Sequence, residues 1–379
     1  MVRGTPVNCG SLIDVGEPGT VAFHVFIRKA CDGAELRSIG YLMLSPEEKR
    51  LRHQRAKQHR TFHQRAKQES RRRRGPQRVN KKKVVPARSS GATLVACPAV
   101  LDFEAAPLES TAFFDELEKT LTKSKVGVIV DHRPLEILSP AAALVLIAYL
   151  FRIHRRKPDL PLFVYIPTRA EPRDLLGLIG YYDYFKKVAW DRPQSAKRHY
   201  LAHKRGELVM PEYARELCNH LQTHGKLSTQ KFYAALVEGM ANATEWGYGQ
   251  KESGYRSWWL LGYRDEITKE MAYCFYDQGV GIPISIRTRF LDMLPGLRPS
   301  GSELIEIAVR EGRYSRTKNK GRGSGLPTLL SFVEEGTDGQ LLIFSNESRC
   351  VFKHGEKTRK DDYNISLRGT LISWSFSPP

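Results

Sequence analysis

Three segments of the sequence carry side chains that could bind or activate a ligand, and the first is residues 232–246, FYAALVEGMANATEW. Its apolar residues recur at helical spacing, and Glu238 and Asn242 stand four residues apart, so both project from one face of the expected helix. A carboxylate and a carboxamide placed in this way could orient a water molecule and coordinate a hard cation such as Mg²⁺. Similar pairs are common on solvated helix faces, so the spacing alone leaves both interpretations open.

The second segment, residues 271–283 (MAYCFYDQGVGIP), is typical of a strand that ends at Asp277 and turns through Gly279 and Gly281. An aspartate at the end of a strand can accept a hydrogen bond from an amino group of a ligand. The two glycines let the backbone adopt positive φ and approach that ligand closely. A tight turn without a ligand is the alternative interpretation.

The third segment is GRGSGL, in which Gly321, Gly323 and Gly325 lead through Leu326 into an apolar helix with Pro327 in its first turn. Glycines that open a helix expose backbone N–H groups, and these can cradle an anion such as a phosphate. The spacing is neither that of the dinucleotide fingerprint nor that of a P-loop, because no G-K-[ST] follows. A flexible hinge is the alternative interpretation.

These motifs follow one another in an informative order, and Gly369–Thr370 precedes the last expected strand. The order helix E-x-x-x-N, strand D-x-G-x-G, loop, and G-x-G-x-G-L resembles the GHKL ATPase family, which includes the nucleotide domains of gyrase B, histidine kinases and MutL. The resemblance covers about residues 207–379. It implies a Bergerat α/β sandwich that binds ATP and Mg²⁺.

The resemblance also implies a role for each motif residue. Glu238 would be the general base, Asn242 would bind Mg²⁺, and Asp277 would accept the adenine amino group. The other residues implied to bind the cofactor are Gly279 and Gly281 at the adenine and ribose, Gly321, Gly323, Gly325 and Leu326 in the lid over the phosphates, and Thr370 beside Asp277 or a bound water. The sequence also predicts a long loop over about 282–320, and the resemblance implies that about 284–320 of it belongs to this lid.

We therefore expect an ATP-binding regulatory protein, a Mg-ATP-dependent switch with ATPase activity. The E-x-x-x-N-A form is more similar to the anti-sigma-factor serine kinases or the ATPase branch than to histidine kinases, which usually carry Asn at the position of Glu238. Two alternatives stay open: a protein serine kinase of the anti-sigma type acting on a STAS domain, and a non-catalytic module that binds nucleotide and nucleic acid.

The upstream stretch VGVIVDHRPLEILSPAAALVLIAYL resembles a STAS domain, the anti-anti-sigma fold, over about residues 93–186. This resemblance implies a protein partner. Ser139 is the one hydroxyl at the place of a phosphoacceptor, and the alternative is a plain helix N-cap followed by Pro140.

The whole chain of 379 residues carries a net charge of +19, and its positive charge is concentrated near the N-terminus. Residues 44–92 form a basic arm in which like charges repel and few apolar groups can be buried, so we expect it to be disordered. It is either a solvated tail or a polyanion-binding arm for RNA, DNA or anionic lipid. Residues 1–43 are unassigned, and the polar residues 187–206 are expected to be a linker before the domain at 207–379.

Composition excludes some classes of protein. The longest apolar run, residues 141–151, is shorter than the roughly 20 residues of a membrane-spanning helix. The six cysteines form no C-x-x-C, the N-terminus lacks the order of a signal peptide, and we expect a cytoplasmic protein with no transmembrane segment.

From residue 93 onward, strands and helices alternate, which predicts an α/β fold: a STAS-like sheet with helices, followed by the Bergerat sandwich. The expected strands are 93–103, 126–130, 162–166, 256–264, 270–277, 340–345 and 367–376, and the expected helices are 110–121, 140–153, 172–185, 209–223, 228–246 and 326–335.

Overall fold

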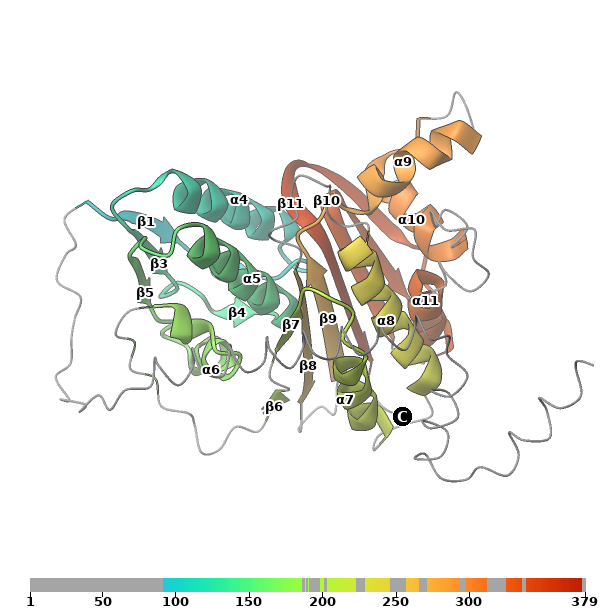
Figure 1. Cartoon of the computed structure of the whole chain (residues 1–379), viewed down its shortest axis with the longest axis horizontal. Helices are drawn as coiled ribbons and strands as arrows, with labels where there is room; N and C mark the ends of the chain where they lie inside the picture. Colours follow the sequence, from blue (N-terminus) through green and yellow to red (C-terminus); the bar gives the residue numbers. More distant parts are fainter. Residues whose placement is uncertain are drawn as a thin grey trace, which may run out of the picture. The chain divides into compact units, whose positions relative to one another are not determined.

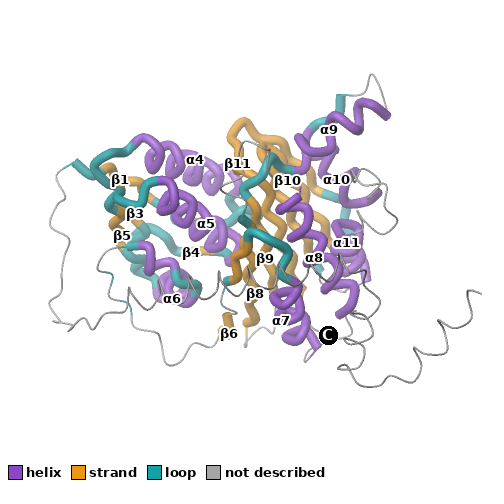
Figure 2. Tube along the Cα trace, viewed as in Figure 1, coloured by secondary structure: helices purple, strands orange, loops and turns teal. Residues whose placement is uncertain are grey.

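The mixed α/β architecture seen in Figures 1 and 2 comes from a computed structural model, and residues 84–379 belong to one unit of it. The structure describes residues 91–379 apart from several gaps. These are 186–187, 189, 191–197, 201–202, 223–228, 246–256, 266–270, 294–297, 312–324, 336–338 and 377–379. Most of the basic arm and all of residues 1–43 therefore lie outside the described residues.

A small parallel sheet, with strand order β1-β3-β5, begins the described chain. Its strands are β1 (Thr93–Ala96), β3 (Val128–Asp131) and β5 (Leu162–Tyr165), and a second parallel pair is β2 (Val100–Leu101) with β4 (Ile137–Leu138). The helices of this half are α4 (Pro107–Lys123), α5 (Pro140–Arg156), α6 (Ala170–Leu178) and the 3-10 helix η1 (Tyr181–Tyr184).

Helix α5 is buried on all sides, because every residue from Ala141 to Leu150 is buried. Ser139 caps it, accepting a hydrogen bond from Ala142 N at 3.3 Å, and Pro140 occupies the first turn, as the sequence predicts. A helix that is apolar all round must be covered on more than one side. One apolar cluster indeed joins α5 to the small parallel sheet and to the large sheet that follows it in the chain.

The large sheet is antiparallel, with strand order β10-β11-β9-β8-β6, and β7 also pairs with β8. Its strands are β6 (Arg198–Tyr200), β7 (Lys204–Gly206), β8 (Trp258–Asp265), β9 (Met271–Asp277), β10 (Gln340–Lys353) and β11 (Arg359–Phe376). The helices of this half are α7 (Pro211–Gln222), α8 (Thr229–Glu245), α9 (Ile282–Met293), α10 (Gly301–Glu311) and α11 (Gly325–Glu335).

Both faces of the large sheet are covered by helices. Side chains alternate along a strand, and here the two alternating sets belong to two different apolar clusters. Trp258, Leu260, Tyr273, Phe275, Ile343 and Ile372 pack with α7, α8, α10 and α11, whereas Trp259, Leu261, Cys274, Tyr276, Phe344 and Leu371 pack with α4 and α5. Figure 1 shows α4 and α5 between the small sheet and the large one, and α8 and α11 beside the large sheet. The two halves therefore share one core.

The structure differs from the expected elements in the first half at two places. The strand expected over 93–103 is two strands, β1 and β2, separated at Pro98, whose missing N–H cannot pair with a neighbouring strand. The helix expected over 172–185 ends at Leu178, because Gly180 adopts φ +80 and a 3-10 turn follows.

The second half differs from the expectation at three places. Residues 282–320, expected to be a long loop, contain helices α9 and α10 in their described parts. Residues 187–206, expected to be a linker, contain the short strands β6 and β7. Strands β10 and β11 extend well beyond 340–345 and 367–376, because the residues between them continue the same hairpin.

A buried arginine joins the two halves. Arg349 on β10 donates from Nη1 to the carbonyl oxygens of Phe103 (2.9 Å) and Glu104 (3.0 Å), and pairs with Asp361 through Nη2. The Glu104 carboxylate in turn pairs at 3.1 Å with Lys353, which lies on β10 like Arg349. The segment after β2 is thus held to the large sheet by charge-assisted hydrogen bonds.

We expect R349M to lower the free energy of unfolding by about 2–4 kcal/mol, because it leaves two buried carbonyls and Asp361 without their partner. Denaturation in guanidinium chloride measures this loss. The matched control is R359M, because Arg359 lies 3.9 Å from the same Asp361 carboxylate but is half exposed. That change should cost less than about 1 kcal/mol, and equal costs for the two variants would contradict the proposed link.

Within the described parts of the chain, no helix has both the length and the apolar character needed to cross a bilayer.

Candidate functional site

Asp277 lies in a row of side chains that crosses four strands of the large sheet. In the β-ladder it pairs with Thr370 of β11 on one side and with Trp258 of β8 on the other, and Thr370 pairs with Ser345 of β10. Directly paired residues project from the same face. The next row on this face belongs to the cluster that packs on the helices, so the row faces α8 and α11.

The Asp277 carboxylate is buried, with 8% of the residue exposed. Burial raises its pKa to about 7, although the hydrogen bond from Gly279 N at 2.8 Å acts to lower it. In the described residues no cation pairs with this carboxylate. A buried, poorly compensated carboxyl at the end of a strand destabilises the fold, and such groups are concentrated at functional sites.

The backbone around Asp277 departs from regular sheet geometry. Gly281 has φ +85 and Gly369 has φ +87, and Asn346 is the one non-glycine residue with positive φ in the described chain. A Cβ on Gly369 would lie 2.0 Å from the carbonyl oxygen of Asp277, so only glycine fits there. Strands β10 and β11 also slip register at Asn346. Irregular backbone of this kind clusters at ligand sites.

Ser345 fixes the loop that follows Asp277. Its hydroxyl accepts from Ile282 N (2.9 Å), the first residue of α9, donates to Gly369 O (3.1 Å), and lies 3.0 Å from Thr370 Oγ1. A hydroxyl offers one donor and two acceptors, so these contacts use the capacity of Ser345, and its 3.5 Å contact with Asn346 Oδ1 can only share the proton donated to Gly369 O. The start of α9 is thereby tied to strands β10 and β11.

Glu238 is on α8, one of the helices that cover this face of the sheet. A Cβ added to its neighbour Gly239 would be 3.9 Å from the ring of Phe275, two residues before Asp277 on the same face. A Cβ added to Gly325 would be 3.0 Å from Glu238 Cδ and Oε2. The carboxyl therefore lies against the first residue of α11. The structure thus brings together the helix, strand and glycine motifs that the sequence singled out.

The other predicted residues have less direct evidence. Asn242 is exposed one turn further along α8, and Leu326 is half-buried between two apolar clusters. Gly321 and Gly323 lie outside the described residues, as does much of the expected lid. Gly279 is buried in the turn after Asp277.

Sequence reasoning missed Ser345 and Asn346. Their signal was a polar pair, Ser-Asn, within an apolar strand run, at residues 341–346 (LLIFSN). Asparagine is depleted in strands and tolerates the left-handed region, so it can mark a bulge.

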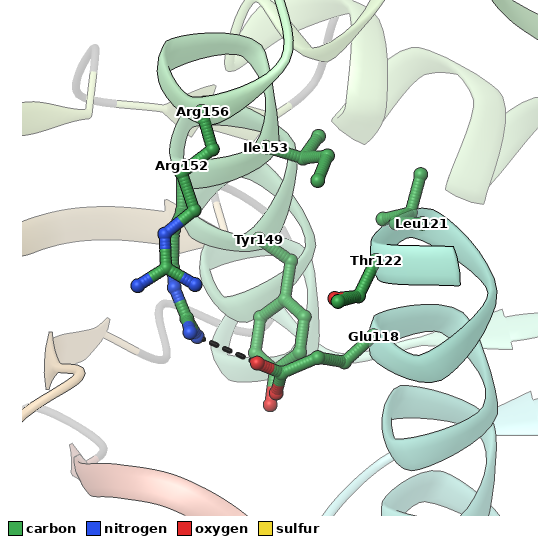
Figure 3. A pocket seen from close by; sticks show the side chains of 7 residues that line it. All are labelled: Glu118, Leu121, Thr122, Tyr149, Arg152, Ile153 and Arg156. Carbon is green, nitrogen blue, oxygen red and sulfur yellow. Dashed lines mark ion pairs between the residues drawn. The ribbon is translucent and has the colours of Figure 1, made fainter. Parts of the chain in front are cut away.

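A small hollow lies elsewhere, between α4 and α5 (Figure 3). Glu118 and Arg152 pair across it at 2.8 Å, with Tyr149 beside them. Its free volume is about 20 Å³, which suffices for roughly one water molecule and is far too small for a nucleotide.

The described residues contain no group of three or more His, Cys, Asp or Glu side chains that could hold a metal ion. No protein-family model matches the chain, and no curated protein matches its sequence.

Proposed function

We propose that residues 207–379 form a GHKL-type ATP-binding domain, that residues 93–186 form a STAS-like domain, and that the chain acts as a Mg-ATP-dependent regulatory switch with ATPase activity. The observation that carries this proposal is the buried row Ser345–Thr370–Asp277, which faces the helix that bears Glu238.

The residues present fit a purine nucleotide. The Asp277 carboxylate is buried and accepts a hydrogen bond from Gly279 N, and its oxygens can accept another from an amino group. Thr370 is its partner on the neighbouring strand. Burial makes a hydrogen bond to such a group stronger than in water. This supports recognition of an adenine amino group by Asp277.

The start of α11 fits a phosphate. The backbone N–H groups of its first turn would hold phosphate oxygens together with those of Gly321, Gly323 and Gly325. Asn242 would supply an oxygen to Mg²⁺, which commonly binds proteins through one or two ligands and takes the rest from phosphates and water. Bound ATP would supply the γ-phosphoryl group, and Mg²⁺ would neutralise part of the negative charge of its phosphates.

Glu238 would act on a water molecule at this end of α11. As a general base it would accept a proton from the water and orient it in line with the phosphoryl group. Its position against Gly325 supports this role, because Gly325 belongs to the glycine motif proposed to hold the phosphates.

A serine kinase that phosphorylates its own Ser139 is less well supported. The Ser139 hydroxyl accepts from Ala142 N and caps α5, so the residue has a structural role. A kinase acting on a separate STAS protein remains the alternative. Residues 44–90 lie outside the described part of the chain, so the polyanion-binding arm remains a prediction.

The test is a thermal-shift titration of the full chain with ATP, ADP and GTP, with and without Mg²⁺, together with phosphate release. A ligand at a hundredfold excess over its Kd should stabilise the protein by about 2.7 kcal/mol. Label from [γ-³²P]ATP on protein rather than in free phosphate would favour the kinase alternative.

E238A should retain the shift with ATP and lose phosphate release by about 100-fold or more, because the general base is removed. E334A, an exposed glutamate on α11, is the control and should keep both properties. No response of the wild type to any of the three nucleotides would rule out the proposed function.

A further inference from the structure

Strand β10 changes direction beside the row that contains Asp277. Ser345 pairs with Thr370, but Asn346 pairs with Leu367, so the register shifts between adjacent residues. Asn346 takes up the change with φ 57. A bulge of this kind turns a side chain away from the direction that regular alternation would give it.

The turned side chain lies against Gly281. A Cβ on Gly281 would be 1.6 Å from Asn346 Oδ1 and 2.6 Å from its Cγ. The absent side chain of Gly281 is thus replaced by the carboxamide of Asn346. The second glycine of the D-x-G-x-G turn therefore makes room for a protein group, in addition to its left-handed backbone conformation.

The carboxamide is held on one side. Asn346 Oδ1 is directed at the Gly281 turn and lies 3.5 Å from Ser345 Oγ, at the long limit of a hydrogen bond. Ser345 itself is locked by Ile282, Gly369 and Thr370. Asn346 is half-buried, and among the described residues no hydrogen bond engages its Nδ2 group.

We propose that Asn346 determines base specificity at this site, donating from Nδ2 to a ring nitrogen of adenine beside the amino group that Asp277 accepts. The inference rests on the proposed function. The acceptor, Asp277, and the donor, Asn346 Nδ2, match adenine, which presents an amino donor beside a ring-nitrogen acceptor. Guanine presents a carbonyl where adenine has its amino group, which would place an oxygen against the Asp277 carboxylate.

Two substitutions separate recognition from bulge geometry. N346G keeps the positive φ without strain but removes the carboxamide. N346D keeps the size and the tolerance for left-handed backbone but replaces the Nδ2 donor by an acceptor. Chemical denaturation confirms that each variant is folded before binding is measured.

The probes are ATP, GTP, 1-deaza-ATP and 7-deaza-ATP, each titrated against the full chain by calorimetry. The wild type should prefer ATP over GTP and should bind one of the two deaza analogues about 3- to 10-fold more weakly than ATP. N346G should bind that analogue and ATP equally, and N346D should lose ATP affinity by about 10-fold or more.

Retention of the wild-type preferences by folded N346G would overturn the inference and leave Asn346 with a role in the bulge alone. Equal binding of both deaza analogues and ATP by the wild type would overturn it as well, while ATP binding itself would still support the proposed function. A wild type that binds none of the probes overturns the proposed function, and the inference with it.

Discussion

Replacing Asp277 by asparagine is expected to stabilise the free protein at pH 8 by about 2–4 kcal/mol and to abolish its stabilisation by ATP. The two effects have one cause. The carboxylate is buried without a cation in the described residues, which destabilises the free protein and leaves an acceptor for the ligand.

The pH dependence identifies the group. Burial raises the pKa of Asp277 from 3.8 to about 7. Between these values the folded protein holds a proton that the unfolded chain has released, so its stability falls as the pH rises towards 7. The advantage of D277N in free energy of unfolding should thus be small at pH 4, grow through pH 5 and 6, and be complete by pH 8. Urea denaturation at several pH values measures it.

D362N is the matched control, because it should act in the opposite direction. Although burial acts to raise it, hydrogen bonds from Ser348 and Ser302 lower the pKa of Asp362. Loss of this charge should therefore destabilise the protein at pH 8. An undiminished ATP response in D277N, or an advantage that does not change with pH, would contradict the assignment of Asp277.

Expression of residues 187–379 without residues 84–186 is expected to give an aggregated product. The fragment would expose the face of the large sheet that α4 and α5 cover, including Trp259, Tyr276 and Phe344, all nearly inaccessible in the chain. Each large apolar side chain contributes roughly 1.5–3 kcal/mol on burial. The five large ones named on this face, Trp259, Leu261, Tyr276, Phe344 and Leu371, would together lose on the order of 10 kcal/mol, which is comparable to the stability of a whole domain.

Solubility and ANS fluorescence measure this result, and co-expression of residues 84–186 should restore a soluble complex. The matched control is the full chain with a protease site inserted within 191–197. After cleavage its two fragments should still elute together, because the shared core remains. A soluble fragment 187–379 that unfolds cooperatively by itself would show that the two halves are independent.

The contact between Glu238 and the glycine motif at Gly325 could be anticipated, because the order of motifs was distinctive. The covering of both sheet faces also had a signal in the continuous apolar runs of β8 and β9, which are typical of strands buried on both sides. The sequence could not say that α5 covers one of these faces, because an apolar helix fits any apolar surface of suitable shape.

Helices α9 and α10 were missed for a different reason. Leu304, Ile305, Ala308 and Val309 recur at helical spacing and are buried. The sequence analysis expected one loop over about 282–320 and passed over this periodicity. Asn346 could not be placed at Gly281 from sequence, because that contact depends on a register shift between strands far apart in the chain.

Asp277 and Tyr276 are consecutive, so their side chains lie on opposite surfaces of the same strand. Asp277 faces the helix that carries Glu238, whereas Tyr276 packs with the helices of the first half and donates to Arg368 O at 2.7 Å. A shift of this one strand is therefore felt by both halves at once. If a ligand at Asp277 displaced β9, the side chains that contact the first half would move with the strand, and no hinge would be needed.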